Sequence, residues 1–179
     1  MLSHATPFAA ADLPSSAGEC LHVNPLWLGE FPPELLTVAR ERTRFLAADA
    51  QGFLRAVDGD GRMTHRAWAE QERYLPLLDL LKVDIKEAGV LTGLGSPRAA
   101  AERIRSLGPK TVLCTHQGGV CVCDSSGVHE APFTGGTLRG RTGRGDTCTA
   151  AFLVAYSERG AAEATRFAAR ITSEKMQQG

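Results

Sequence analysis

With 179 residues, the chain is long enough for a single domain with a sizeable core. Its 20 Lys and Arg balance 20 Asp and Glu, so no net field favours nucleic acid or an anionic membrane as partner. The N-terminus lacks a signal-peptide pattern, and no apolar run approaches the ~18 residues of a membrane span. We therefore expect a cytoplasmic protein that binds neither nucleic acid nor membrane, and the sequence leaves its oligomeric state open.

The elements expected in chain order alternate between strands and helices. Residues 1–18 are small, polar and interrupted by proline, which predicts a flexible tail. The strands are expected at 20–24, 45–48, 81–84, 111–115, 119–123 and 128–132. The helices are expected at 32–42, 74–80, 86–91, 97–107, 147–158 and 161–176. Between them, residues 56–66 form an excursion rich in turn residues.

This alternation predicts an α/β sheet covered by helices on both faces, with a late antiparallel insertion. Ligands bind such sheets beyond the carboxyl ends of the strands. Asp49, Asp84 and Thr115 lie near predicted strand ends, as does a glycine-rich loop. The five cysteines show no metal-site spacing and predict buried, reduced thiols.

The glycine-rich loop is the segment with the clearest chemical signal. Gly140, Gly143 and Gly145 precede one acidic residue, Asp146, and an apolar helix pattern follows at once. Such a loop brings bare backbone N–H groups close to an anion, with a helix N-terminus behind it. A carboxylate beside a bound phosphate is explained if it is a general base, so the loop indicates phosphoryl transfer.

Other interpretations of the loop exist. Asp is a preferred N-cap whatever the function of the protein. The tripeptide Arg144-Gly145-Asp146 also spells a cell-adhesion sequence, but it runs straight into an apolar helix. No Gly-Lys-Ser/Thr follows the glycines, so the loop is not a Walker loop.

Three segments together resemble the PfkB/ribokinase group of carbohydrate and nucleoside kinases. Residues 140–153 resemble the C-terminal signature of the group, with Arg144 replacing the usual Ala. Residues 82–88 resemble its Asn-x-x-Glu element, with Asp84 in place of Asn, and 112–124 resemble its nucleotide-side strand–turn–strand. Residues 25–32 and 49–55 are similar to an inositol kinase-like branch.

The resemblance implies a ribokinase-like α/β sheet flanked by helices on both faces, lacking the N-terminal part and the lid of full-length members. Residues 19–179 would then be a partial, nucleotide-side kinase domain that uses ATP and Mg²⁺ to phosphorylate a hydroxyl of a sugar or polyol. The implied roles are these: catalytic base, Asp146; phosphate-binding anion hole, Thr142, Gly143, Arg144 and Gly145; nucleotide binding, Thr115, His116, Lys175 and Met176; substrate side, Asp49, Gln51 and Arg141; Mg²⁺ through water, Asp84 and Glu87.

Several alternatives stay open at this stage. Asp84 and Glu87 are equally readable as a solvated acidic pair at a helix start, His116 as structural, and Met176 as a core residue. The whole chain is either a kinase, a non-catalytic nucleotide-binding remnant, or an incomplete gene product without an independent role.

Overall fold

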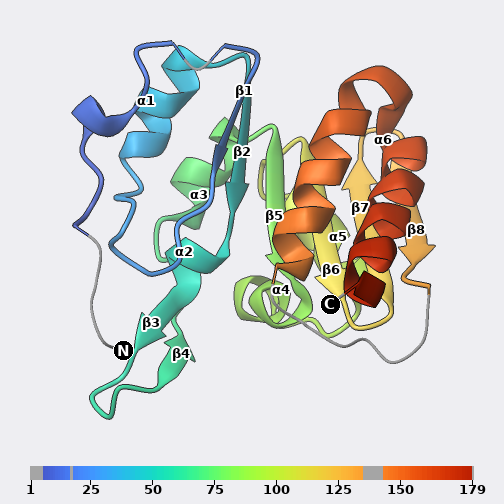
Figure 1. Ribbon diagram of the computed structural model, residues 1–179. Coiled ribbons are helices and arrows are strands. Elements are labelled where there is room, and N and C mark those ends of the chain that lie inside the picture. Colours follow the sequence, from blue (N-terminus) through green and yellow to red (C-terminus); the bar gives the residue numbers. More distant parts are fainter. Residues whose placement is uncertain (1–5, 17, 135–142, 179) are drawn as a thin grey trace.

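The computed structural model describes residues 6–16, 18–134 and 143–178, and its centre is one six-stranded sheet (Figure 1). The strands run in the order β1-β2-β5-β6-β7-β8. Their bounds are β1 Cys20–Val23, β2 Phe45–Asp49, β5 Leu80–Asp84, β6 Thr111–His116, β7 Gly119–Asp124 and β8 Gly127–Pro132. The first four strands are parallel, whereas β7 and β8 pair antiparallel. All six strands lie where the sequence predicts them.

Helices cover both faces of this sheet, as predicted (Figure 1). One face carries α1 (Leu35–Arg42), α4 (Ile85–Thr92) and α5 (Pro97–Arg105), packed on residues such as Leu81. The other face carries α6 (Arg144–Gln178), packed on Leu80 and Leu113. Neighbouring strand residues point to opposite faces. Lys82, two residues after Leu80, therefore points toward α6.

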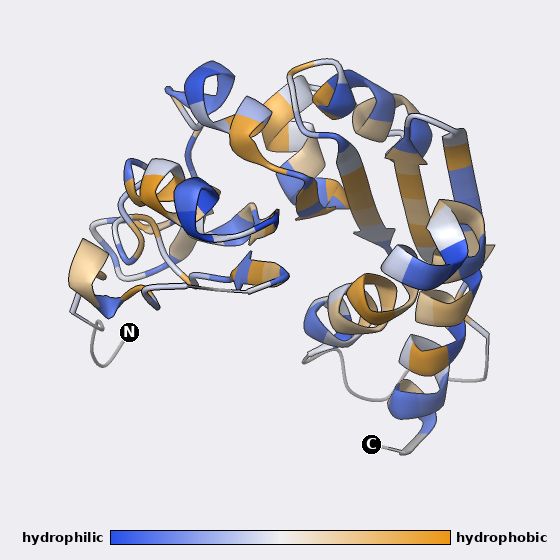
Figure 2. Cartoon of the chain, turned by 90° about the horizontal axis from the view of Figure 1, so that it is seen from above, coloured by the Kyte–Doolittle hydropathy of each residue, from blue (hydrophilic) through white to orange (hydrophobic). Residues whose placement is uncertain are grey.

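Local signals set the ends of these helices. Asp84 caps α4 by accepting hydrogen bonds from the backbone N–H groups of Lys86 and Glu87, and α4 ends at Gly93 with a left-handed φ of 75°. Helix α6 contains one break, at Gly160 with φ 71° and ψ 173°, and so corresponds to the two predicted C-terminal helices. Figure 2 shows hydrophobic and hydrophilic residues alternating along the helices.

Three segments differ from the prediction. Residues 74–80 were expected to form one helix. Tyr74 instead ends α3 (Gln71–Tyr74), and Leu75–Leu77 form a 3₁₀ turn. The chain then enters β5 at Leu80. Pro76 lacks the N–H that a continuing helix needs, and pairing with β2 extends the chain from Leu80. After the short helix α2 (Gln51–Leu54), the turn-rich excursion is a hairpin of β3 (Arg55–Val57) and β4 (Met63–His65).

The described part of the segment expected to be a tail, residues 6–16, lies against α1 and the loop before it. The ring of Phe8 lies 6.0 Å from that of Phe31, and Leu13 is buried. Arg42 donates from Nη1 to the carbonyl oxygens of Ala10 and Leu13, at 3.2 and 3.0 Å. The interpretation as a loose tail does not account for these contacts, because isolated apolar residues carry no periodic signal.

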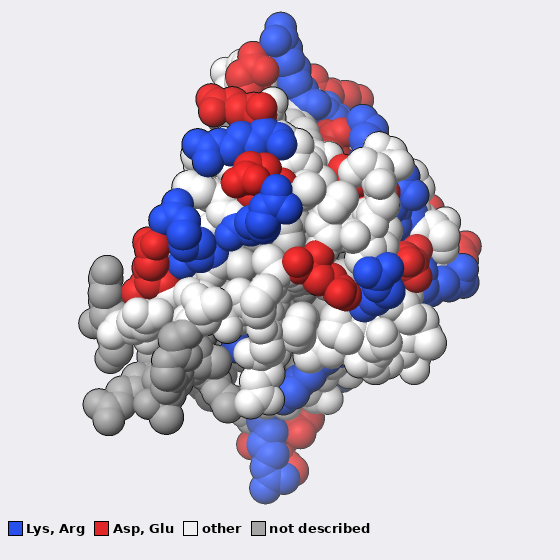
Figure 3. All heavy atoms as spheres, turned by 90° about the vertical axis from the view of Figure 1, so that its right-hand side faces the viewer, with Lys and Arg blue, Asp and Glu red and all other residues white. Residues whose placement is uncertain are grey.

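The surface agrees with the balanced composition. On the face in Figure 3, basic and acidic side chains are interspersed and do not gather into a patch of one sign. Within the described ranges, no helix combines the length and apolar character that crossing a bilayer requires.

Candidate functional site

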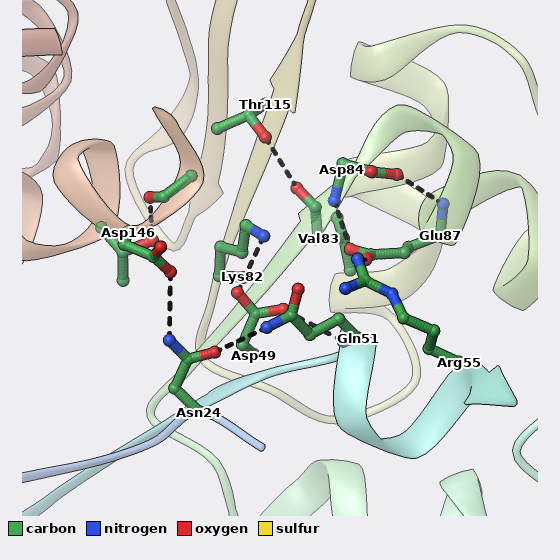
Figure 4. A network of polar contacts seen from close by, with 12 residues as sticks. Asn24, Asp49, Gln51, Arg55, Lys82, Val83, Asp84, Glu87, Thr115 and Asp146 are labelled. Atoms are coloured by element: carbon green, nitrogen blue, oxygen red, sulfur yellow. Dashed lines mark hydrogen bonds and ion pairs between the residues drawn. The ribbon is translucent and has the colours of Figure 1, made fainter. Parts of the chain in front are cut away.

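A polar cavity of about 330 Å³ lies where the carboxyl ends of the parallel strands meet the N-terminus of α6 (Figure 4). The strand order brings together the ends of β2, β5 and β6, as the sequence predicts. The cavity is lined by Leu26, Gln51, Arg55, Lys82, Asp84, Thr115, Gly143, Arg144, Gly145 and Asp146.

The described end of the glycine loop forms one wall of this cavity. Gly143 has φ +76°, a left-handed conformation that side chains rarely adopt, and α6 begins at the next residue. Its carbonyl oxygen accepts from the backbone N–H and the hydroxyl of Thr147, at 2.9 and 2.8 Å. The N–H groups of the first helical turn have no intrahelical acceptor, and the helix dipole places partial positive charge there. The wall is therefore suited to an anion.

Asp146 lies in this first turn with its side chain exposed toward the cavity. Its Oδ1 accepts a hydrogen bond of 3.0 Å from Nδ2 of Asn24, which follows β1. Oδ1 of Asn24 accepts one of 3.0 Å from Nε2 of Gln51 (Figure 4). Because the amide oxygen of Asn24 accepts from Gln51, the amide is oriented with its nitrogen toward Asp146. The carboxylate is thereby held on the cavity side of the helix.

Asp49, expected on the substrate side, is instead buried and does not line the cavity, with 1% of its surface exposed. Its Oδ2 forms an ion pair of 2.7 Å with Nζ of Lys82, and its Oδ1 accepts from the backbone N–H of Gln51 at 3.0 Å. The register explains the pairing, since Asp49 and Lys82 are direct neighbours in β2 and β5. Gln51 does line the cavity, and its role on the substrate side stays a prediction.

Asp84 and Glu87 form a capping box, in which Oε2 of Glu87 accepts from the backbone N–H of Asp84 at 2.7 Å. Oε1 of Glu87 is buried without a hydrogen bond, and Nη2 of Arg55 lies 3.7 Å away. Burial raises the pKa of Glu87 to about 7, although the charge of Lys82 opposes the rise. The pair does lie at a helix start, but it is not solvated as that interpretation expected, because Glu87 is fully buried and its Oε1 accepts no hydrogen bond.

This pair suits a hydrated Mg²⁺, an ion that proteins bind through one or two carboxylates, water and substrate phosphates. Asp84 lines the cavity, and Oε1 of Glu87 lacks a hydrogen bond. Among the described residues there is no group of three or more His, Cys, Asp or Glu that could hold a metal. The donor set therefore fits an ion shared with a phosphate ligand and not an all-protein cage.

Of the residues expected on the nucleotide side, only Thr115 lines the main cavity. Thr115 lines the main cavity and, with Asp84 and Arg144, a second cavity of about 310 Å³. Nδ1 of His116 accepts from the backbone N–H of Gly118, and burial lowers the pKa of His116. Lys175 is exposed and reaches Gly143: its Nζ is 3.0 Å from where a Cβ on that glycine would lie. Met176 is buried.

Arg141 and Thr142, expected on the substrate side and in the anion hole, lie outside the described residues. Four residues at the site were missed from the sequence: Leu26, Arg55 and Lys82, which line the cavity, and Asn24, which contacts Asp146. Asn24 carries no local signal, because its contact to Asp146 spans 122 positions. Lys82 had one, since a lysine inside the apolar run 80–83 needs a buried partner.

Comparison with known proteins now identifies the class. The pfkB family of carbohydrate kinases matches residues 8–179, so the chain belongs to this family. A comparison with curated protein sequences gives no match.

Among solved structures, a pyrophosphate-dependent kinase of the ribokinase family in a sulfate complex is 48% identical with a TM-score of 0.93. That match covers 98% of this chain and 63% of the other. A structure described as such a kinase with a pyrophosphate analogue and myo-inositol gives the same identity and TM-score, and 64% of it is covered. This chain thus spans less than two thirds of their length. Arabidopsis thaliana ribokinase, solved with ribose and ATP, shares the fold. It is 21% identical with a TM-score of 0.68, and the match covers 88% of this chain and 49% of that one.

Proposed function

We propose that this chain carries the donor side and the general base of a kinase that phosphorylates a hydroxyl of a polyol or sugar. The observation that supports this most is the position of Asp146, whose carboxylate stands in the first turn of α6, beside a left-handed glycine, in a polar cavity. The interpretation of Asp146 as a helix N-cap is wrong, because Asp146 is the third residue of α6 and its carboxylate accepts from Nδ2 of Asn24, 122 positions away.

In this proposal the carboxylate of Asp146 takes the proton of the acceptor hydroxyl. The oxygen then forms a bond to the terminal phosphorus of the donor, and the bond from that phosphorus to its bridging oxygen breaks. The leaving phosphate group keeps the electron pair. The N–H groups of Gly143, Arg144 and Gly145 donate to the transferring phosphoryl group, whose charge such fixed dipoles stabilise. Mg²⁺ near Asp84 and Glu87 would neutralise charge on the donor phosphates.

For the donor, we propose pyrophosphate, with ATP as the alternative. Identity of 48% to a pyrophosphate-dependent kinase over 98% of this chain supports the first. The family signature and the shared fold of a ribokinase solved with ATP support the second, which the sequence predicts. The acceptor proposed is myo-inositol or a similar polyol, by analogy with the 48% identical structure. The boundary at residue 19 and a cytoplasmic location remain predictions.

The test is a ³¹P NMR assay of the chain with Mg²⁺, myo-inositol and either pyrophosphate or ATP. We expect a phosphomonoester signal with pyrophosphate. A signal with ATP alone would reverse the choice of donor. Donor binding without any product, measured by calorimetry, would favour the non-catalytic remnant, and neither binding nor product would contradict the proposal.

A further inference from the structure

A buried lysine lies directly beneath the start of α6, at the described end of the glycine loop. Lys82 is the third residue of β5 and is only 5% exposed. Its neighbours in the strand, Leu81 and Val83, belong to the core on the opposite face of the sheet. The side chain therefore points to the α6 face, and Figure 4 shows it between Asp146 and Asp84.

The ammonium group of Lys82 is charged, and only one of its N–H donors has a side-chain partner among the described residues. Burial on its own lowers the pKa of Lys82, but the neighbouring charges of Asp49 and Glu87 outweigh it and raise that pKa. An ammonium group has three N–H donors. Asp49 takes one of them at 2.7 Å, the sole side-chain partner of Lys82 among the residues with described coordinates.

The same group lies against the start of α6. A Cβ built on Gly145 would be 3.0 Å from Nζ and 3.1 Å from Cε of Lys82. Lys82 also lines the 330 Å³ cavity together with Arg144 and Asp146. A lysine that served only to neutralise Asp49 would not need to face this cavity, and an isolated buried ion pair contributes little net stability.

We propose that Lys82 is a ligand of the donor phosphate, with its ammonium group contacting an oxygen of the phosphoryl group that is transferred. Asp49 is then a positioning residue that holds the ammonium beneath the loop, and it is not a substrate contact. This inference rests on the proposed function. Loss of one such charge-stabilising donor in a shielded site lowers turnover by about 10²–10³-fold.

The first test measures pyrophosphate binding by calorimetry. Lys82→Met alone leaves Asp49 as a buried, unpaired charge, so the main variant is Lys82→Met with Asp49→Asn, which removes the whole pair. We expect it to fold and to bind pyrophosphate at least about tenfold more weakly. Lys110→Met is the control for removing a lysine from an ion pair elsewhere, because Lys110 forms an ion pair of the same 2.7 Å length with Asp79 and does not line the cavity. It should bind as the wild type does.

The second test uses the wild-type chain, so it does not depend on the folding of a variant. The lysines of the chain are Lys82, Lys86, Lys110 and Lys175, few enough to assign by ¹⁵N NMR of their ammonium groups. Added pyrophosphate should shift the Lys82 signal and leave that of Lys110 in place. An unmoved Lys82 signal at saturating pyrophosphate, or a folded double variant with unchanged affinity, overturns the role of Lys82 alone. Failure of the wild type to bind pyrophosphate or ATP overturns the proposed function as well.

Discussion

Substitution of Gly145 by valine is expected to damage both folding stability and donor binding. A Cβ at this position would lie 3.0 Å from Nζ and 3.1 Å from Cε of Lys82, closer than ordinary van der Waals contact. Lys82 cannot easily retreat, since its side chain is 6% exposed and is fixed to Asp49 at 2.7 Å. Overpacking of this kind costs about 1–3 kcal/mol. The better helix propensity of valine returns only about 0.4 kcal/mol, so the steric cost prevails.

The assay combines urea unfolding, followed by circular dichroism, with calorimetry of pyrophosphate binding. Gly160→Ala is the matched control, because Gly160 has φ +71° with nothing within 4 Å of an added Cβ. Its backbone, with φ +71° and ψ 173°, lies in a region almost restricted to glycine, so alanine costs about 1–3 kcal/mol without touching the site. We expect both variants to lose stability and only Gly145→Val to lose affinity. Equal affinity in the two variants would refute the close contact between the loop and Lys82.

Two further predictions concern groups around the cavity. Asn24→Ala removes the 3.0 Å hydrogen bond that holds Asp146, so kcat should fall by up to about 10²-fold while the KM for pyrophosphate stays constant. A rise in KM without a change in kcat would contradict this positioning role. For Glu87, the folded pKa of about 7 exceeds the ordinary 4.5, so the folded state holds the proton more tightly. Its contribution therefore makes the free energy of unfolding fall as pH rises from about 4.5 to 7, by at most about 1.4 kcal/mol per pH unit. In EDTA, Glu87→Gln should flatten this slope, and an unchanged slope would exclude Glu87 as its source.

The sheet could be predicted because its signals are local. Short apolar runs separated by helix starts at Asp84 and Pro97 define the strands, and Gly93 marks a helix end in the sequence itself. The parallel order places the carboxyl ends at one edge, which correctly brought Asp84, Thr115 and the glycine loop to one cavity. The hairpin β3–β4 was missed because its strands are three residues each, too short for a period-two pattern.

The contacts inside the site could not be predicted in the same way. Asp49 was expected to face the substrate because it ends a strand. In the sheet it lies beside Lys82 of β5 and forms an ion pair with that buried lysine. The contact from Asn24 to Asp146 depends on how the end of β1 meets α6 across the sheet. Periodicity and spacing describe neighbours along the chain, whereas these side chains meet only through the strand order.

The central claim is that Asp146 is the general base, and Asp146→Asn tests it most directly. Phosphoryl transfer to myo-inositol should be followed by ³¹P NMR, and pyrophosphate binding by calorimetry on the same preparation. Loss of the base should lower turnover by about 10²–10⁴-fold and leave pyrophosphate affinity unchanged, because the loop N–H groups remain in place. Wild-type turnover in Asp146→Asn would contradict the account.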